Sequence, residues 1–459
     1  MDFSYLFLLA AISFSALFIF CLREELGISI VLLLGCYFVP LQNLIISKPY
    51  YLSDNLLDFF LYFFLIVVIL LKISTGKRFR IVKTPLNLPI IFFLCSILIT
   101  GIFSLIFYSQ TPGLVFMGLM GMSPYIMFFP IIYGIKNDKQ LKFVIVFIFV
   151  LATVSAIFTI ISSFYPNSPF AFANVVEEWG FGYYYHRTYP YGTHVVVFAF
   201  LISVSILPFL KSGFIKIFLL CVILTLFFAI ILTFTRSIWV PMVITIAGLL
   251  AFLPWKKVWS YSRWLITIAV LVMIASIYLN YYSPSFYYGG LIPTVSKGFL
   301  SSFKAFQFTG ALTAEPSFNA RILEAQQGIN VIRNNLIAGV GYKYHLNTAD
   351  ATVSYLHNGY VSILMVQGLI GFIPFMWLII TFFFRSLKIY RSLNESLNKG
   401  LVLGFMGGFW FILMYAFVGN DLQYGKVMIL VLMLIMGLSE VVYRLNNERK
   451  RGAPNWRHT

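Results

Sequence analysis

HNGYVSILMVQGLIGFIPFMWLIITFFF, residues 357–384, contains no Asp, Glu, Lys or Arg and is apolar over almost its whole length. About 20 consecutive apolar residues are enough to cross a bilayer as a helix. The segment therefore predicts a transmembrane helix that begins at His357 and Asn358. The residues just before it, 321–356, are polar by contrast, so ionisable groups gather where the chain enters the membrane.

Apolar runs of similar length recur along the chain. Of its 459 residues 60% are hydrophobic and only 10% are charged, and the mean hydropathy is +0.91. Soluble domains carry about 25% charged residues, and a membrane barrel would show short alternating segments instead. These features predict an all-α polytopic membrane protein, with residues 1–459 forming a single transmembrane domain.

The runs predict about 12–13 transmembrane helices, depending on whether both of the first two segments cross the membrane. The N-terminal run lacks a basic region and a cleavage site, so we expect it to be retained rather than removed as a signal peptide. The predicted spans are 3–22, 26–46, 56–71, 89–108, 114–134, 143–164, 193–210, 217–234, 237–254, 264–282, 357–384, 400–418 and 425–443.

The connecting segments alternate in charge. Basic segments hold most of the 32 Lys and Arg residues, and they are 72–88, 135–142, 211–216, 255–263, 385–399 and the C-terminal tail. Basic loops stay in the cytoplasm, so we expect a cytoplasmic C-terminus and outer (periplasmic) loops at 165–192 and 283–356. The net charge of +17 is then a consequence of topology, with a small contribution from contacts with anionic membrane lipid. It does not indicate binding to nucleic acid.

The larger outer loop, 283–356, is too long for a simple connector. Its centre, EPSFNARILEAQQGINVIRNN, predicts a helix. Ser317 or Asn319 could cap this helix. An apolar stripe would pack on the bundle or lie at the membrane interface, and it consists of Ile322, Ala325, Ile329 and Ile332.

Several cationic residues lie on the outer side, against the usual charge rule. Arg236, between two apolar runs, is either a residue reaching the interface or a guanidinium that binds a phosphate. Arg321 is either an ion-pair partner of Glu324 on a surface helix or a functional residue. Arg187, in YYYHRTYPYGTH, lies among tyrosines that are also typical of a membrane interface.

His357 is the candidate general base. An interfacial histidine can be merely solvated, but imidazole is the side chain best suited to take a proton near neutral pH. The chain has no Asp-x-Asp, His-Glu-x-x-His or Cys-x-x-Cys motif, and Gly339-Val340-Gly341 lacks the residues of a phosphate-binding P-loop. We therefore expect no metal site and no cofactor.

Three segments together resemble the O-antigen ligase and polymerase family. They are LTFTRSIWVPMVITI, NARILEAQQGINVIRNNLIAGVGY and HNGYVSILMVQGLIGFIPF. The family pattern places Ser/Thr-Arg at the outer end of a span, then an Arg-led helix with a Gly-x-Gly turn, then His-Asn at the start of the next span. The resemblance covers about 233–375. Family members commonly have an acidic residue just before the last glycine-containing element of the pattern. This chain has Gln367 at that position, so we assign no role to an acid there.

The resemblance implies a membrane glycosyltransferase (GT-C-like) bundle in the bacterial inner membrane. Such a protein would be a metal-independent, inverting enzyme that transfers glycan from a polyisoprenyl-diphosphate-linked oligosaccharide donor at the outer face. By this resemblance Arg236 and Arg321 would stabilise the diphosphate and His357 would deprotonate the acceptor hydroxyl. Arg187 and Asn358 would bind substrate.

Alternatives remain within and beyond this family. A polymerase would extend a glycan acceptor and work with a chain-length regulator protein, whereas a ligase would transfer finished glycan to lipid A core. We expect a polymerase of O-antigen, capsule or exopolysaccharide, because the first third of the chain departs from the family pattern. A flippase or transporter for lipid-linked oligosaccharide is the rival from another class, and it would need ionisable residues near the bilayer midplane.

Overall fold

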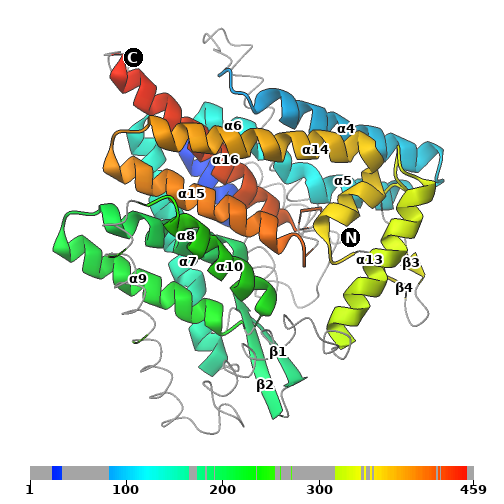
Figure 1. Cartoon of the computed structure of the whole chain (residues 1–459), viewed down its shortest axis with the longest axis horizontal. Coiled ribbons are helices and arrows are strands. Elements are labelled where there is room, and N and C mark those ends of the chain that lie inside the picture. Colours follow the sequence, from blue (N-terminus) through cyan, green and yellow to red (C-terminus); the bar gives the residue numbers. More distant parts are fainter. Residues whose placement is uncertain are drawn as a thin grey trace, which may run out of the picture. The chain divides into compact units, whose positions relative to one another are not determined.

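The computed structural model describes most of the predicted membrane segments. The described residues are 23–33, 82–164, 173–180, 183–190, 192–233, 235–253, 259, 270, 316–342, 346–347, 352–353, 356–419, 422–423 and 425–451. The secondary-structure elements keep the labels of Figure 1.

The elements are mostly helices. Those of the first half are α4 (Asn87–Ile106), α5 (Pro112–Met122), η1 (Ser123–Met127), α6 (Phe128–Gly134), α7 (Asp138–Phe164), β1 (Ala173–Gly180), β2 (Tyr183–Pro190), α8 (Thr193–Ile206), η2 (Leu207–Phe209), α9 (Gly213–Ile231) and α10 (Arg236–Leu250). The second half contributes α13 (Pro316–Asn334), β3 (Leu346–Asn347), β4 (Thr352–Val353), α14 (Gly359–Ser392), α15 (Ser396–Tyr415) and α16 (Lys426–Lys450).

The described part of the chain contains seven helices long and apolar enough to cross a membrane. They are Asn87–Ile106, Pro112–Gly134, Asp138–Ser163, Gly213–Ile231, Gly359–Ser392, Ser396–Tyr415 and Lys426–Lys450, and the shorter apolar helices are Thr193–Phe209 and Ser237–Leu250. These coincide with the predicted spans and confirm an all-α polytopic membrane protein. The predicted spans 3–22, 56–71 and 264–282, and most of 26–46, fall outside the described residues.

The helices pack as two compact units, which are described separately. The first unit comprises Met1–Ile148, Leu323–Leu393 and Ala416–Thr459, and the second comprises Phe149–Ile322 and Asn394–Tyr415. The single transmembrane domain over 1–459 stays a prediction.

In the first unit, α4 runs alongside α14 (Figure 1). Their contact is built around three buried aromatic side chains, Phe93, Tyr125 and Phe375. The ring of Phe93 lies 4.8 Å from that of Tyr125 and 5.4 Å from that of Phe375, centroid to centroid. Because lipid is as apolar as these rings, close van der Waals packing rather than exclusion of water favours this arrangement.

Helix α14 is broken at Gly368, whose backbone is not helical (φ 60°, ψ −161°). The break leaves two carbonyls and two N–H groups without their helical partners, and unsatisfied backbone is costly in a membrane. A loop after α13 supplies the missing partners. The four bonds run from Val340 N to Met365 O (2.9 Å), Gly341 N to Val366 O (3.0 Å), Leu369 N to Leu336 O (2.9 Å) and Ile370 N to Ile337 O (3.2 Å).

The loop can approach α14 this closely because of its glycines. Gly339 and Gly341 have φ of 69° and 81°, a conformation that L side chains rarely adopt. A Cβ atom at Gly339 would collide with the Val366 carbonyl. The Gly-x-Gly turn seen in the sequence therefore belongs to the loop that hydrogen-bonds to the backbone groups left unpaired at the break in α14.

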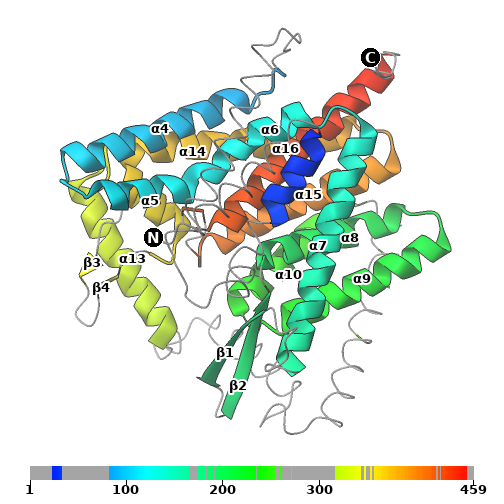
Figure 2. The same ribbon diagram turned by 180° about the vertical axis from the view of Figure 1, so that it is seen from behind.

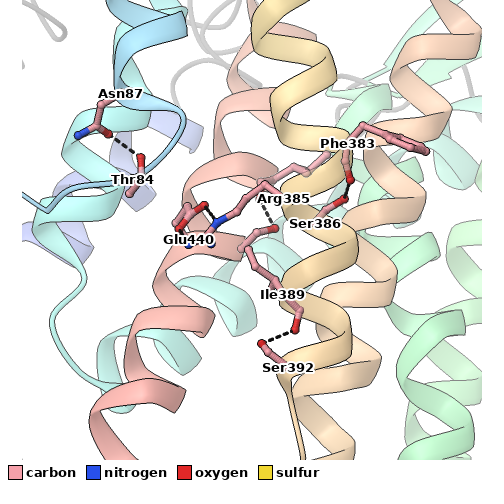
Figure 3. Close-up of polar contacts among 10 residues, drawn as sticks. Thr84, Asn87, Phe383, Arg385, Ser386, Ile389, Ser392 and Glu440 are labelled. Atoms are coloured by element: carbon pink, nitrogen blue, oxygen red, sulfur yellow. Dashed lines mark hydrogen bonds and ion pairs between the residues drawn. The ribbon is translucent and has the colours of Figure 1, made fainter.

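A buried ion pair joins α14 to α16 (Figure 3). Arg385 donates from Nε to one oxygen of Glu440 (2.6 Å) and from Nη2 to the other (2.8 Å). Its guanidinium carbon also lies 4.2 Å from the ring centroid of Tyr443. The side chains of Arg385 and Glu440 are only 12% and 3% exposed, so each charge depends on the other.

Helix α16 also closes the end of α6, beside which it lies (Figure 2). Arg444 donates to the carbonyls of Ile132 (2.7 Å) and Ile135. Arg449 pairs with Asp138 at 2.5 Å, at the start of α7. The last helix thus satisfies backbone groups at the end of α6 that have no partner within that helix.

In the second unit, α15 packs closely against α8 through glycines. A Cβ at Gly404 would lie 2.7 Å from the Cα of Ile202, and one at Gly400 would lie 3.1 Å from the Cα of Ile206. Small residues four apart let two membrane helices bring their backbones together. This contact brings the backbones of α15 and α8 close together within the second unit.

Part of segment 165–192, which was predicted to be an outer loop, forms a hairpin that was not expected from the sequence. Strands β1 and β2 pair antiparallel, from Ala173 opposite Pro190 to Gly180 opposite Tyr183. Beyond the hairpin, α8 begins after Gly192, whose φ of 70° turns the chain into the helix.

The helix predicted at the centre of segment 283–356 is confirmed as α13, with one correction. It begins at Pro316, so Ser317 and Asn319 lie inside its first turn rather than at its cap. In the predicted apolar stripe Ile332 is buried and Ile329 is 43% exposed, and packing on the bundle or at the membrane interface stays a prediction. The buried face also passes through Gly328, where a Cβ would lie 2.7 Å from Leu356.

The Arg385–Glu440 pair leads to a stability prediction. Glu440→Gln leaves a buried guanidinium without its counter-ion, and we expect the free energy of unfolding to fall by about 3–5 kcal/mol. Denaturant unfolding in detergent measures this. The double variant Arg385→Met, Glu440→Leu should recover most of the loss, and Glu395→Gln at an exposed position is the matched control. A double variant less stable than Glu440→Gln would contradict the prediction.

The hydrogen bonds between the loop 336–341 and the break in α14 lead to a second prediction. Gly339→Ala places a methyl group against the Val366 carbonyl and strains a positive φ, so we expect little folded protein by size-exclusion chromatography in detergent. Gly113→Ala is the control, since no atom lies within 4 Å of a Cβ at that position. Equal yields of the two variants would show that the loop is not required for folding.

Candidate functional site

The start of α14, in the first unit, is held in place by several hydrogen bonds. The Asn358 side chain accepts hydrogen bonds from the backbone N–H groups of Tyr360 and Val361, both at 3.0 Å, and so caps the helix. Gly359 N donates to the carbonyls of Ala416 (2.8 Å) and Gly419 (3.0 Å). These contacts place His357 at a fixed position, one residue before the cap.

Asn358 was predicted to bind substrate, and the structure gives its side chain several protein contacts. Besides capping α14, its amide donates to the Phe417 carbonyl at 3.3 Å. A role in substrate binding stays a prediction.

His357 is held by a carboxylate from α13. Its Nδ1 lies 2.7 Å from Oε2 of Glu324, and its backbone N–H points to the same oxygen at 3.4 Å. The Glu324 side chain is 12% exposed and that of His357 is 37% exposed. The carboxylate is therefore the inner member of the pair and the imidazole the outer one.

Glu324 was considered only as one possible ion-pair partner of Arg321, so its contact with His357 was missed. The two contacting residues are 33 positions apart, a distance at which a single sequence carries no pairing information. One signal could have found it. Glu324 lies four positions before Gly328, on the face of α13 where a missing side chain allows close packing.

Arg321 lies on α13 one turn before Glu324 and is partly buried. Residues three apart share a face of a helix. Within the part of the chain that the structure describes, its guanidinium has no hydrogen bond or ion pair, whereas Arg385 and Arg444 are fully engaged. A partly buried guanidinium with no partner among the described residues is suited to an anionic ligand.

The other two predicted arginines lie on neighbouring segments of the second unit. Arg187 is in β2, opposite Val176, and Arg236 is the first residue of α10. Thr188 N donates to the Leu232 carbonyl at 3.2 Å, which joins β2 to the turn before α10. Figure 2 shows the hairpin beside α10.

A second contact joins the same two segments. The hydroxyls of Tyr189 and Thr235 lie 3.2 Å apart, so the residue after Thr188 contacts the residue before Arg236. In the sequence, only the family resemblance connects Arg187 with Arg236. Their backbone segments are in fact hydrogen-bonded to each other, although they are far apart in sequence.

The N-terminal position of Arg236 has an electrostatic consequence. The N-terminus of a helix carries partial positive charge from its unpaired N–H groups. Arg236 is the first helical residue of a 15-residue helix. Phosphate is the anion that such a helix end and a guanidinium bind well.

The two groups of predicted residues fall in different units. Arg187, Arg236 and Arg321 belong to the second unit, and His357 belongs to the first. Their convergence on one site stays a prediction.

The helices define the class of this protein as a multi-pass α-helical membrane protein. Residues 220–376 match the family model described as O-antigen ligase, which supports the resemblance drawn from the sequence. The matched region contains Arg236, Arg321, His357 and Asn358, and it also contains Glu324 and the break in α14. Arg187 precedes it. A comparison with curated proteins found no match.

Proposed function

We propose that the protein is a membrane glycosyltransferase. It transfers oligosaccharide repeat units from a polyisoprenyl diphosphate to a glycan acceptor. The observation that carries the proposal is the His357 imidazole, held at 2.7 Å by Glu324 at the start of α14. This pair lies inside the region matched by the O-antigen ligase family and at the end of an apolar helix, where a lipid-linked substrate would enter.

In this proposal the arginines stabilise the leaving group. As the bond between sugar and diphosphate breaks, negative charge builds up on the diphosphate oxygens. Guanidinium groups stabilise that charge most strongly where water is excluded. Arg321 has a guanidinium without a partner among the described residues, and Arg236 stands at a positive helix end. Arg187, on the strand bonded to the turn before α10, is the third candidate.

His357 is the proposed general base. Its Nδ1 faces Glu324, so Nε2 is the nitrogen that would take the proton of the acceptor hydroxyl. The acceptor oxygen then forms a bond to the anomeric carbon, and the bond from that carbon to the diphosphate oxygen breaks. The polyisoprenyl diphosphate leaves with the bonding electron pair. A single displacement of this kind inverts the anomeric configuration.

The proposal includes metal independence and a location at the outer face of the bacterial inner membrane. The arginines supply the positive charge that a divalent cation would otherwise provide. The basic loops support a cytoplasmic C-terminus, which puts the loop containing α13 and His357 on the outer side. The lipid tail of the donor would lie against the helices, with its sugars above them.

The acceptor distinguishes two candidate activities. We propose a polymerase, in which the acceptor is a second lipid-linked glycan and a chain-length regulator protein is a partner. A ligase that transfers glycan to lipid A core is the second candidate, and the description of the matching family as O-antigen ligase favours it. Both activities use the same donor and the same site residues.

Activity of the purified protein tests the proposed site. We expect the protein in lipid vesicles to release polyisoprenyl diphosphate from a lipid-linked oligosaccharide when an acceptor is present. His357→Ala should lower kcat about 10²- to 10⁴-fold, since it removes the base. Arg321→Ala should lower it about 10²- to 10³-fold, since it removes a charge-stabilising donor. Chromatography of the labelled glycan measures both.

The control for these variants is Arg333→Ala, an exposed arginine of the same helix. It should retain wild-type activity. Wild-type turnover in both His357→Ala and Arg321→Ala would disprove the site, and loss of wild-type activity with a chelator would disprove metal independence.

A deletion strain separates polymerase from ligase. If the protein is a polymerase, we expect single repeat units on lipid A core, because transfer to the core continues without chain extension. Unmodified core together with long glycan on the lipid carrier would instead identify a ligase. Gel electrophoresis of surface and carrier-linked glycan distinguishes the two results.

A further inference from the structure

Glu324 has no role in the family pattern described above, yet its carboxylate lies 2.7 Å from the ring of the candidate base. Its carboxylate accepts from both the ring and the backbone of His357 through a single oxygen. Two contacts to one oxygen restrict the rotation of the imidazole as well as its position. Few side-chain conformations of His357 allow the ring and the backbone N–H to contact the same oxygen.

The tautomer of His357 follows from this contact. A carboxylate is an acceptor only, so Nδ1 must carry the hydrogen that it donates to Glu324. The lone pair is then on Nε2, on the opposite edge of the ring. When Nε2 takes a proton, the ring becomes a cation, and the adjacent carboxylate stabilises that cation. Because Glu324 is only 12% exposed, water weakens this stabilisation little.

The position of Glu324 is fixed at two points along α13. One turn after Glu324, Gly328 lets the helix approach the residues on either side of the His357–Asn358 pair. A Cβ at Gly328 would lie 2.7 Å from Leu356 and 3.3 Å from Val361. Further along, the loop after α13 is bonded to the break in α14. Glu324 thus lies on α13, and these contacts hold α13 against the start of α14, where His357 lies.

We propose that Glu324 is a positioning residue that sets the tautomer and orientation of the general base. This rests on the proposed function, because it takes His357 to be the base. A purely structural ion pair is the competing explanation. The two differ in what happens when His357 is absent, since a positioning residue then has nothing to position.

The test is a double-mutant cycle on the purified protein in vesicles, assayed with a polyisoprenyl-diphosphate oligosaccharide. Glu324→Gln keeps the size of the side chain but lets an amide N–H face Nδ1, which favours the wrong tautomer. We expect kcat to fall about 10²-fold or more while KM for the donor changes by less than about threefold. In a His357→Ala background, Glu324→Gln should have no further effect on kcat.

Two controls accompany the cycle. Glu395→Gln makes the same chemical change at an exposed position, and Arg333→Gln removes a charge from an exposed position of α13. Both should retain wild-type kcat. If Glu324→Gln does not yield folded protein, Glu324→Asp replaces it. Its shorter carboxylate keeps the charge but lengthens the contact, so kcat should fall about 10-fold, again only when His357 is present.

The outcomes separate this proposal from the proposed function. Wild-type kcat in Glu324→Gln, or an equal fold-loss with and without His357, overturns the positioning role and leaves His357 as the base. An inactive wild-type protein, or wild-type kcat in His357→Ala, overturns the proposed function and the positioning role with it.

Discussion

The central constraint on this fold is that backbone groups in a membrane must find partners within the protein. Helix α14 breaks at Gly368, and the break is tolerated because residues 336–341 bond to the exposed backbone. This arrangement holds α13 against α14, although α13 belongs to the long segment between two membrane helices. The register between the two helices is thereby set, and with it the short contact between Glu324 and His357.

The apolar runs predicted the membrane helices well. Length and composition alone located α4, α8 and α15 to within about four residues, because nothing but a helix satisfies such a run in lipid. The break at Gly368 could not be predicted in the same way. Where every side of a helix is apolar, the pattern of apolar residues does not reveal where the helix is interrupted. A glycine in such a run is as consistent with close packing between helices as with a break.

The candidate site was predictable in its residue types and less so in its contacts. Arg236 and His357 stand out as polar residues at the ends of apolar runs, and Arg321 stands out as a cation in the long segment between them. The partner of His357 does not, because Glu324 has an equally good explanation on its own helix and the true contact is distant in sequence. The hairpin that carries Arg187 was also missed, since its tyrosines are equally typical of a membrane interface.

The hydrogen bonds of Arg444 have a consequence for the order in which the protein matures. This residue is near the C-terminus, yet it donates to the Ile132 carbonyl, 312 positions earlier in the chain. A chain emerging from the ribosome inserts α6 long before α16 has been synthesised. The Ile132 carbonyl therefore lacks its hydrogen bond from Arg444 until translation is almost complete. Protein truncated before the last helix would lack this contact however well its earlier helices had inserted.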